Sequence, residues 1–173
     1  MKRVSVGFVF CAALLVGACG GSGGADDGGA GADSGGARSI YGLVVEAGAE
    51  LPGVNLSGAD LSGAYLVGIN LAGADLTGAN LSGADLSGAN FLDANLYQAN
   101  LSGANLNVAN LHRADLVDAD MSGADLTGAD LSGTFLLNTN LREANLTGAD
   151  LSRSNRTTAD FTGATMPDGT KNP

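Results

Sequence analysis

From about Leu51 onward, small, polar and large apolar residues recur with a period of five. The unit reads ADLSG at residues 59–63 and ANLSG at residues 79–83. The large apolar position recurs up to Met166 and is nearly always leucine, the position two before it is almost always alanine, and Asp or Asn usually lies between them. A period of five matches neither a helix nor the alternation of a continuous strand, but it is explained if each unit is a short strand followed by a corner.

The Ser/Thr-Gly pair that usually completes each unit predicts a turn at the corner. Glycine accepts backbone conformations that other residues resist and is a poor helix former, so its recurrence argues against a helical solenoid. The pattern therefore predicts that Ala and Leu point inward, that Asp and Asn point outward, and that successive coils stack.

Both ends of such a stack need caps, because each coil contacts only its neighbours and the terminal strands are otherwise open. Residues 39–50 are expected to cap the first coil. Arg156 is the one polar residue in the row of large apolar positions. An unpaired charge is costly in a core, so we expect Arg156 to turn outward in the last coil, and Pro167 to end the strand pairing.

The A(D/N)LSG pattern resembles that of the pentapeptide-repeat family over residues 46–170. The resemblance implies an all-β fold, a right-handed quadrilateral β-helix with four pentads per coil. The repeats of residues 51–168 would then form about six coils, and at about 4.8 Å per stacked strand the rod would be roughly 30 Å long. Residues 169–173 are expected to form a C-terminal tail.

The N-terminus has the pattern of an export signal. Two basic residues precede an apolar run at residues 4–18, which is too short to span a bilayer but suits the core of a signal peptide. The run ends in VGAC at residues 16–19, which resembles the lipobox of bacterial lipoproteins. We therefore expect residues 1–18 to be removed and Cys19 to carry a lipid anchor in a bacterial membrane. The alternative is an ordinary secretory signal that leaves Cys19 as a free thiol.

Residues 19–38 follow as a Gly-rich tether, because up to Gly36 they contain no apolar side chain larger than alanine. Cleavage of the signal would leave Cys19 as the one cysteine, so no intrachain disulfide is possible and packing alone must stabilise the fold. The chain has 18 acidic and 8 basic residues and a net charge of −10. This surplus disfavours nucleic acids and anionic lipid head groups as direct partners, and a basic partner, or no partner, fits better.

No constellation of reactive residues predicts an enzyme. The single histidine, His112, lies at a corner, and no second histidine or neighbouring cysteine is available to form a metal site or a nucleophile pair. We interpret His112 as a surface residue rather than a catalytic base. The many Asp residues lack the nine-residue signature of calcium-binding solenoids, so we expect no metal, cofactor or small-molecule substrate.

The repeat is broken at a few outward positions, and these are the candidate binding residues. With twenty residues per coil, Tyr97, Val117 and Leu137 fall in one column at a corner where Ser or Thr is usual, with Phe135 beside them. Exposed apolar patches rimmed by polar groups often mark interfaces. The candidate protein-binding ridge also includes residues of an adjoining face, Leu92, His112 and Arg113. The alternative is a solvated surface on which scattered apolar residues have no function.

Together these features predict a membrane-anchored, non-enzymatic scaffold of the bacterial cell envelope that displays a rigid rod to an unknown envelope protein. An alternative follows from quinolone-resistance members of the family, which resemble DNA in shape and charge and bind DNA gyrase. The acidic residues are compatible with such a role. A protein tethered outside the cytoplasm could not meet gyrase, so this alternative requires that the export signal is misread.

Overall fold

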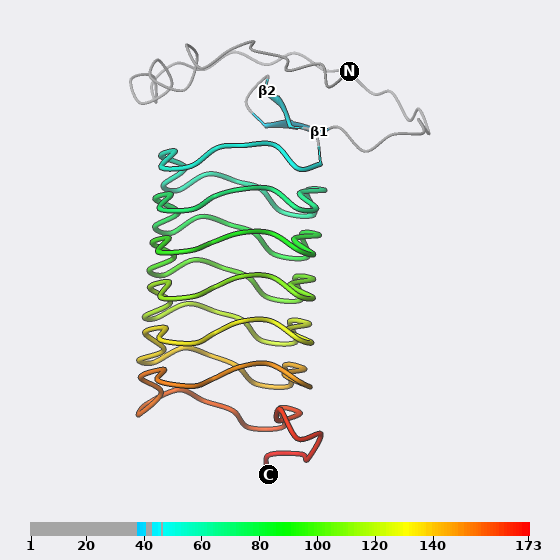
Figure 1. Ribbon diagram of the computed structural model, residues 1–173, viewed down its shortest axis with the longest axis vertical. Coiled ribbons are helices and arrows are strands. Elements are labelled where there is room, and N and C mark those ends of the chain that lie inside the picture. Colours follow the sequence, from blue (N-terminus) through cyan, green and yellow to red (C-terminus); the bar gives the residue numbers. More distant parts are fainter. Residues whose placement is uncertain (1–37, 41–42, 46) are drawn as a thin grey trace, which may run out of the picture. The chain divides into compact units, whose positions relative to one another are not determined.

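The computed structural model describes residues 38–40, 43–45 and 47–173 (Figure 1). The predicted signal peptide, Cys19 and all of the tether except its last residue lie outside these residues. Within the three described ranges, no helix has the length and apolarity needed to cross a membrane.

Two short antiparallel strands precede the repeats. They are β1 (Arg38–Ile40) and β2 (Leu43–Val45), and Ser39 pairs with Val44 at their centre. Apart from Arg38, these strands fall within residues 39–50, the segment predicted to form the N-terminal cap. Residues 41, 42 and 46 of that segment are outside the described part.

The repeats form a four-sided coil in which one residue of each pentad pairs with the residue twenty positions later. Parallel bridges run from Glu50 with Asn70 to Asn145 with Thr165, one bridge for each pentad. Each strand is therefore only about one bridging residue long, and a corner follows at once. Figure 1 shows the coils stacked in register. This arrangement confirms the predicted quadrilateral β-helix of about six coils.

The backbone of each pentad is satisfied by the coils on either side. The Leu71 amide donates to the Asn90 carbonyl at 2.7 Å, and the Asn90 amide donates back to the Ile69 carbonyl at 2.8 Å. Across the corner, the Ala74 amide donates to the Leu71 carbonyl at 3.0 Å and closes the turn. Because most of these bonds link neighbouring coils, the rod is stabilised by nearest-neighbour contacts throughout its length.

We number the four sides of the coil in chain order by the columns of residues that form the bridges. The columns are, on the first side, Glu50, Asn70, Asn90, Asn110, Asp130 and Asp150; on the second, Asn55, Asp75, Asn95, Asp115, Phe135 and Asn155; on the third, Asp60, Asn80, Asn100, Asp120, Asn140 and Asp160; and on the fourth, Tyr65, Asp85, Asn105, Asp125, Asn145 and Thr165. Each corner is numbered after the side that precedes it, so the second side lies between the first and second corners.

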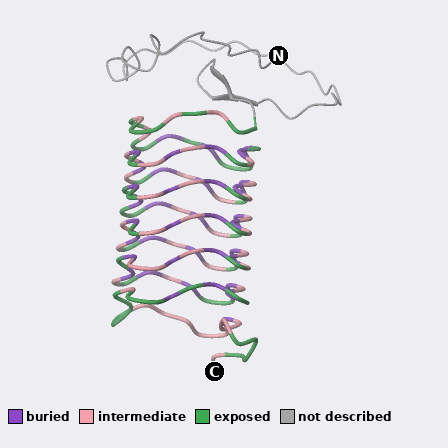
Figure 2. Cartoon of the chain, viewed as in Figure 1, coloured by how far each residue is buried: buried purple, intermediate pink, exposed green. Residues whose placement is uncertain are grey.

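The interior of the rod is a continuous column of leucine and alanine, drawn as the buried segments of Figure 2. Leucines of the central coils, such as Leu106, are 0% exposed. A fully buried leucine contributes roughly 1.5–3 kcal/mol, so the stacked leucines are the main source of stability. Two buried threonines replace alanine without leaving a polar group unsatisfied, since the hydroxyls of Thr134 and Thr139 donate to the carbonyls of Leu131 and Leu116.

The C-terminal end departs from the regular coil. Arg156 is exposed, as predicted from its misfit in the apolar row. The last parallel bridge ends at Thr165, and Lys171 then pairs with Thr165 in the antiparallel direction. The amide of Asn172 donates to the Ala164 carbonyl at 2.8 Å. The segment expected to be a tail thus folds back onto the last coil and satisfies part of its open edge.

Candidate functional site

The three residues of the predicted apolar column lie one above another at the second corner. The Gln98 amide donates to the Val117 carbonyl at 3.0 Å, and the Asp118 amide donates to the Leu137 carbonyl at 2.9 Å. Tyr97 is 37% exposed, and Val117 and Leu137 are half-buried. The predicted stacking is therefore confirmed, and these three side chains with Phe135 are called the apolar ridge below.

Phe135 lies beside this column on the second side. It bridges Asp115 in the coil before and Asn155 in the coil after, where every other residue of the column is Asp or Asn, and it is 50% exposed. An aromatic ring exposed to this extent in a polar ladder contributes little to the core. Its position extends the apolar surface from the corner onto the second side.

The other predicted residues, Leu92, His112 and Arg113, lie at the first corner. The Asp93 amide donates to the His112 carbonyl at 3.0 Å, and the Arg113 amide donates to the Ser132 carbonyl at 3.0 Å, so the corner stacks regularly. The first and second corners are the two edges of the second side. The structure therefore brings all seven predicted residues onto one side of the rod and its two edges.

The charges on this side are unevenly compensated. Arg113 Nε lies 3.0 Å from Asp93 Oδ1, so this cation is paired within its own corner. Asp115 accepts the Val117 amide at 3.0 Å, and Asp118 accepts the Asn138 side-chain amide at 2.9 Å. Among the described residues neither of these two carboxylates forms a salt bridge. The middle of the apolar ridge is therefore flanked by two uncompensated negative charges.

His112 has a partner that sequence reasoning missed. Its Nδ1 lies 2.7 Å from Ser132 Oγ in the next coil, and its backbone amide donates to Asn110 Oδ1 at 3.0 Å. A histidine beside a serine is one element of a nucleophilic site, but within the described residues no hydrogen bond reaches His112 Nε2 to orient the ring as a base. The twenty-residue spacing was the signal that could have placed Ser132 next to His112.

The sequence pattern also did not predict which corners keep a left-handed backbone without glycine. Within the described residues, eight residues other than glycine have positive φ. Six of them lie on the two corners that flank the second side: Asp93, Arg113 and Arg153 on the first corner, and Gln98, Asp118 and Asn138 on the second. The left-handed conformation costs an L-residue roughly 1–2 kcal/mol. The signal in the sequence was the loss of glycine at the last position of these pentads.

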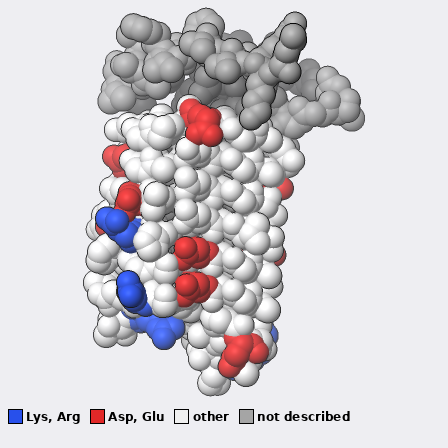
Figure 3. All heavy atoms as spheres, in the orientation of Figure 1, with Lys and Arg blue, Asp and Glu red and all other residues white. Residues whose placement is uncertain are grey.

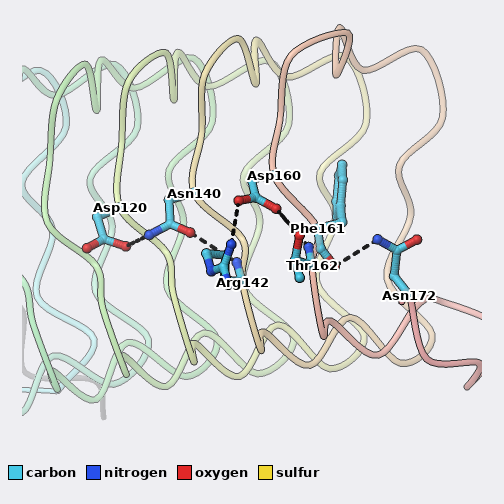
Figure 4. A network of polar contacts seen from close by, with 7 residues as sticks. All are labelled: Asp120, Asn140, Arg142, Asp160, Phe161, Thr162 and Asn172. Atoms are coloured by element: carbon cyan, nitrogen blue, oxygen red, sulfur yellow. Dashed lines mark hydrogen bonds and ion pairs between the residues drawn. The ribbon is translucent and has the colours of Figure 1, made fainter.

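The carboxylate and amide ladders on the third side have a structural explanation (Figure 4). Asn140 donates to Asp120 at 2.9 Å, and Arg142 donates to Asp160 Oδ2 at 3.1 Å. Asp160 Oδ1 accepts both the hydroxyl of Thr162, at 2.6 Å, and its amide, at 2.9 Å. The pKa of Asp160 is held below its usual value. The hydrogen bond from the Thr162 hydroxyl is the main cause, followed by those from the Thr162 amide and from Arg142.

The same turn geometry lowers the pKa of other aspartates. The Ser62 hydroxyl and amide act on Asp60, and the Thr170 hydroxyl and amide act on Asp168. At Asp150 the amide of Ser152 is the main cause, followed by the Ser152 hydroxyl. Among the described residues, no group of three or more His, Cys, Asp or Glu could hold a metal ion. The aspartates act here as turn acceptors.

The distribution of charge differs along the rod. In residues 47–112 there are five acidic residues and no lysine or arginine, and the basic residues of 47–173 all lie at or beyond Arg113. Figure 3 shows one face, on which most of the visible basic side chains lie along one edge while the acidic ones are spread over the coils. The surface formed by residues 47–173 is therefore acidic with local compensation.

Comparison with known proteins agrees with the architecture. The family described as pentapeptide repeats (8 copies) matches residues 55–93, 89–128 and 119–163, more than half of the chain. The chain belongs to the pentapeptide-repeat family. The right-handed quadrilateral β-helix of these proteins is thus the fold of this chain. Proteins of this family are typically structural or interaction proteins rather than enzymes.

Solved structures of pentapeptide-repeat proteins resemble the chain. HetL from the cyanobacterium Nostoc sp. strain PCC 7120, involved in heterocyst differentiation regulation, is 37% identical with a TM-score of 0.51, and the match covers 73% of this chain. Rfr23 from the cyanobacterium Cyanothece 51142 is 29% identical with a TM-score of 0.60, and the match covers 65% of this chain and 88% of Rfr23. The chain spans 65% of the length of HetL, slightly under two thirds.

QnrB1, a plasmid-mediated fluoroquinolone resistance protein, is a more distant structural match. It is 21% identical with a TM-score of 0.40, over 69% of this chain and 73% of QnrB1. At these values the match supports no functional comparison. No curated protein sequence shows a significant match to the chain.

Proposed function

We propose that this pentapeptide-repeat protein is a membrane-anchored, non-enzymatic scaffold of the bacterial cell envelope, and that its second side binds another protein. The observation that carries the proposal is the concentration of irregularity on that side. The partly exposed apolar ridge lies there. Six of the eight non-glycine residues with positive φ in the described part of the chain lie on the two corners that flank it. A fold made from one repeated unit does not require these departures, so a role in binding accounts for them.

The anchoring part of the proposal rests on the N-terminal sequence. A basic start, a short apolar run and the VGAC sequence ending at Cys19 match the order of features in a lipoprotein signal. A lipoprotein with two or more acyl chains stays stably at a membrane, whereas one chain holds it only marginally. If residues 20–36 behave as a Gly-rich coil, their root-mean-square end-to-end distance would be about 20–25 Å, which sets the distance between the anchor and the rod.

A scaffold also fits the chemistry of the exposed groups better than an enzyme does. Most aspartates and asparagines of the ladders accept an amide from the residue two positions later, as Asp130 does from Ser132 at 2.8 Å. His112 is held by its contact to Ser132. Each of these groups therefore has a local structural partner, and none needs a substrate to explain its position.

The first test is the intact mass and membrane fractionation of the protein from its native host, with the Cys19→Ala variant as control. A diacylglyceryl adduct on Cys19, absent from the variant, is the expected result. An unprocessed protein in the soluble fraction would overturn the anchoring proposal. That outcome would make the gyrase alternative the next hypothesis, and a supercoiling assay would test it.

A further inference from the structure

The apolar ridge repeats at a distance that suits a particular kind of partner. Tyr97, Val117 and Leu137 occupy successive coils, and paired strands lie about 4.7–4.9 Å apart. Side chains three or four positions apart on an α-helix rise about 4.5–6 Å along its axis, whereas alternate side chains of a strand are roughly 6.6 Å apart. A helix parallel to the rod axis therefore stays in register with the three ridge side chains, and a strand does not.

The charges beside the ridge define the chemistry of that helix. Asp115 precedes the middle ridge residue, Val117, by two positions, and Asp118 follows it directly. Neither carboxylate forms a salt bridge within the described residues, while Arg113 is already paired with Asp93. The complementary surface is an apolar stripe bordered by lysine or arginine.

The same charges disfavour other occupants. A second copy of the chain in an isologous contact would place Asp115 and Asp118 close to the same carboxylates of its partner, which is unfavourable. An anionic lipid surface or a nucleic acid would meet the same repulsion. The ridge therefore selects for a cationic protein segment.

The polar edge of the ridge is held in place by its own contacts. Gln98 donates to the Tyr97 hydroxyl at 3.1 Å, and Asn138 donates to Asp118 at 2.9 Å. All three edge residues, Gln98, Asp118 and Asn138, have φ between 57° and 59°. These left-handed residues replace the usual glycine on three successive coils and provide a polar edge next to each ridge side chain. Such an edge, ordered before binding, reduces the entropy lost when a partner docks.

We propose that the apolar ridge binds a cationic amphipathic α-helix of a partner protein, aligned with the rod axis. This inference rests on the proposed function, because it names the chemistry of the partner that the second side binds. Tyr97, Val117 and Leu137 would contact the apolar stripe of the helix, and Asp115 and Asp118 would face its lysines or arginines.

The test uses synthetic peptides as probes for the full chain, isolated from its membrane in a zwitterionic detergent. The first peptide is an 18-residue helix with a leucine stripe bordered by lysines. A second peptide has glutamate for every lysine, and a third has the first composition in an order that removes the stripe. Fluorescence anisotropy of the labelled peptides measures binding, and the detergent alone is the blank.

Two substitutions remove the proposed contacts without disturbing the repeat. Leu137→Ser restores the residue type that is usual at this position, and Asp115→Asn restores the other common residue of the ladder. We expect Leu137→Ser to weaken binding of the lysine peptide about five- to tenfold and Asp115→Asn about threefold, since the first removes apolar contact and the second a charge at the edge.

Matched controls lie in the same coils on other parts of the rod. Thr147→Ser changes the fourth corner in the coil of Leu137, and Asp125→Asn changes the fourth side in the coil of Asp115. Both controls should bind the lysine peptide as the unchanged chain does. Circular dichroism of all four variants checks that the fold is kept.

Specific results would overturn the inference. They are equal binding of the glutamate or rearranged peptide, equal losses in ridge and control variants, or no binding of the lysine peptide at all. Self-association of the chain in analytical ultracentrifugation that Leu137→Ser abolishes would also overturn it, in favour of a second copy as occupant. If Cys19 carries lipid in the mass measurement, these failures leave membrane anchoring standing; if Cys19 is unmodified, anchoring fails whatever the peptides do.

Discussion

Replacing Val108 with asparagine should make the rod more stable. Val108 lies at the fourth corner with φ of 50°, and it is the one β-branched residue among the described residues that have positive φ and are not glycine. Its side chain is 61% exposed. A β-branched residue in the left-handed region is strained, whereas asparagine adopts that region more readily than most residues.

The expected gain follows from two opposing contributions. The left-handed strain costs an ordinary L-residue roughly 1–2 kcal/mol, and asparagine relieves much of it. Because the valine is mostly exposed, the apolar burial that is lost is less than about 1 kcal/mol. The net change is therefore a gain of about 0.5–1 kcal/mol for Val108→Asn. Val108→Gly should gain less, because glycine adds conformational freedom to the unfolded chain and thereby costs about 0.5–1 kcal/mol.

Guanidinium unfolding of the full chain, followed by circular dichroism, measures this difference. The midpoint should rise for Val108→Asn with an unchanged slope, since the surface exposed on unfolding stays the same. Gly103→Val is the matched control, because Gly103 has φ of 64° in the same coil and a Cβ there would meet nothing within 4 Å. That control should lower the midpoint, because the left-handed strain on a β-branched residue outweighs the gain from removing the freedom of glycine in the unfolded chain. A lower midpoint for Val108→Asn would refute the argument that left-handed residues strain the corners. The proposal that the second side binds a protein also rests on this strain.

Three further predictions concern the core, the last coil and the response to acid. Leu106→Ala should destabilise the rod by about 2–5 kcal/mol in the same unfolding assay, because Leu106 is 0% exposed and the rigid coils on both sides leave a cavity. Arg156→Leu should not lower the melting temperature in a thermal scan, because the exposed Arg156 occupies an apolar position of the repeat; a lower melting temperature would contradict that interpretation. Asp160 has a lowered pKa in the fold, so the stability that it contributes is present above the unfolded value of about 3.8–3.9 and is lost as the pH falls through the still lower folded pKa. Asp160→Asn should therefore show a smaller loss of melting temperature between pH 5 and about pH 2 than the unchanged chain, and an equal loss would contradict this assignment.

Much of the fold could be predicted from the sequence because the repeat makes every coil equivalent. The five-residue period predicts that Ala and Leu point inward and that Arg156 turns outward. Together with the twenty-residue coil, it also predicts the stacking of Tyr97, Val117 and Leu137. These features depend on backbone geometry, which one unit determines for all units. The lipid on Cys19 lies outside the described residues, and it stays a prediction.

Contacts between neighbouring coils were harder to predict, because they depend on side chains twenty residues apart. The contact of His112 with Ser132 and the pairing of Arg113 with Asp93 each require a particular rotamer as well as the right column. The sequence pattern marks the missing glycines but does not show that the chain keeps the left-handed turn without them. Binding by the ridge likewise depends on a partner and stays a prediction.

The position of the ridge along the rod is also informative. Its residues occupy the third to fifth coils, whose central leucines are fully buried, whereas Leu56 in the first coil and Met166 in the last are only partly buried. In a structure held by nearest-neighbour contacts, the terminal coils open most easily and the central ones least. A binding surface on the central coils is therefore presented by the most rigid part of the rod. A helix that docks there loses its own conformational entropy, but the scaffold loses little because it is already ordered. For this reason a ridge of only four apolar side chains can contribute usefully to affinity.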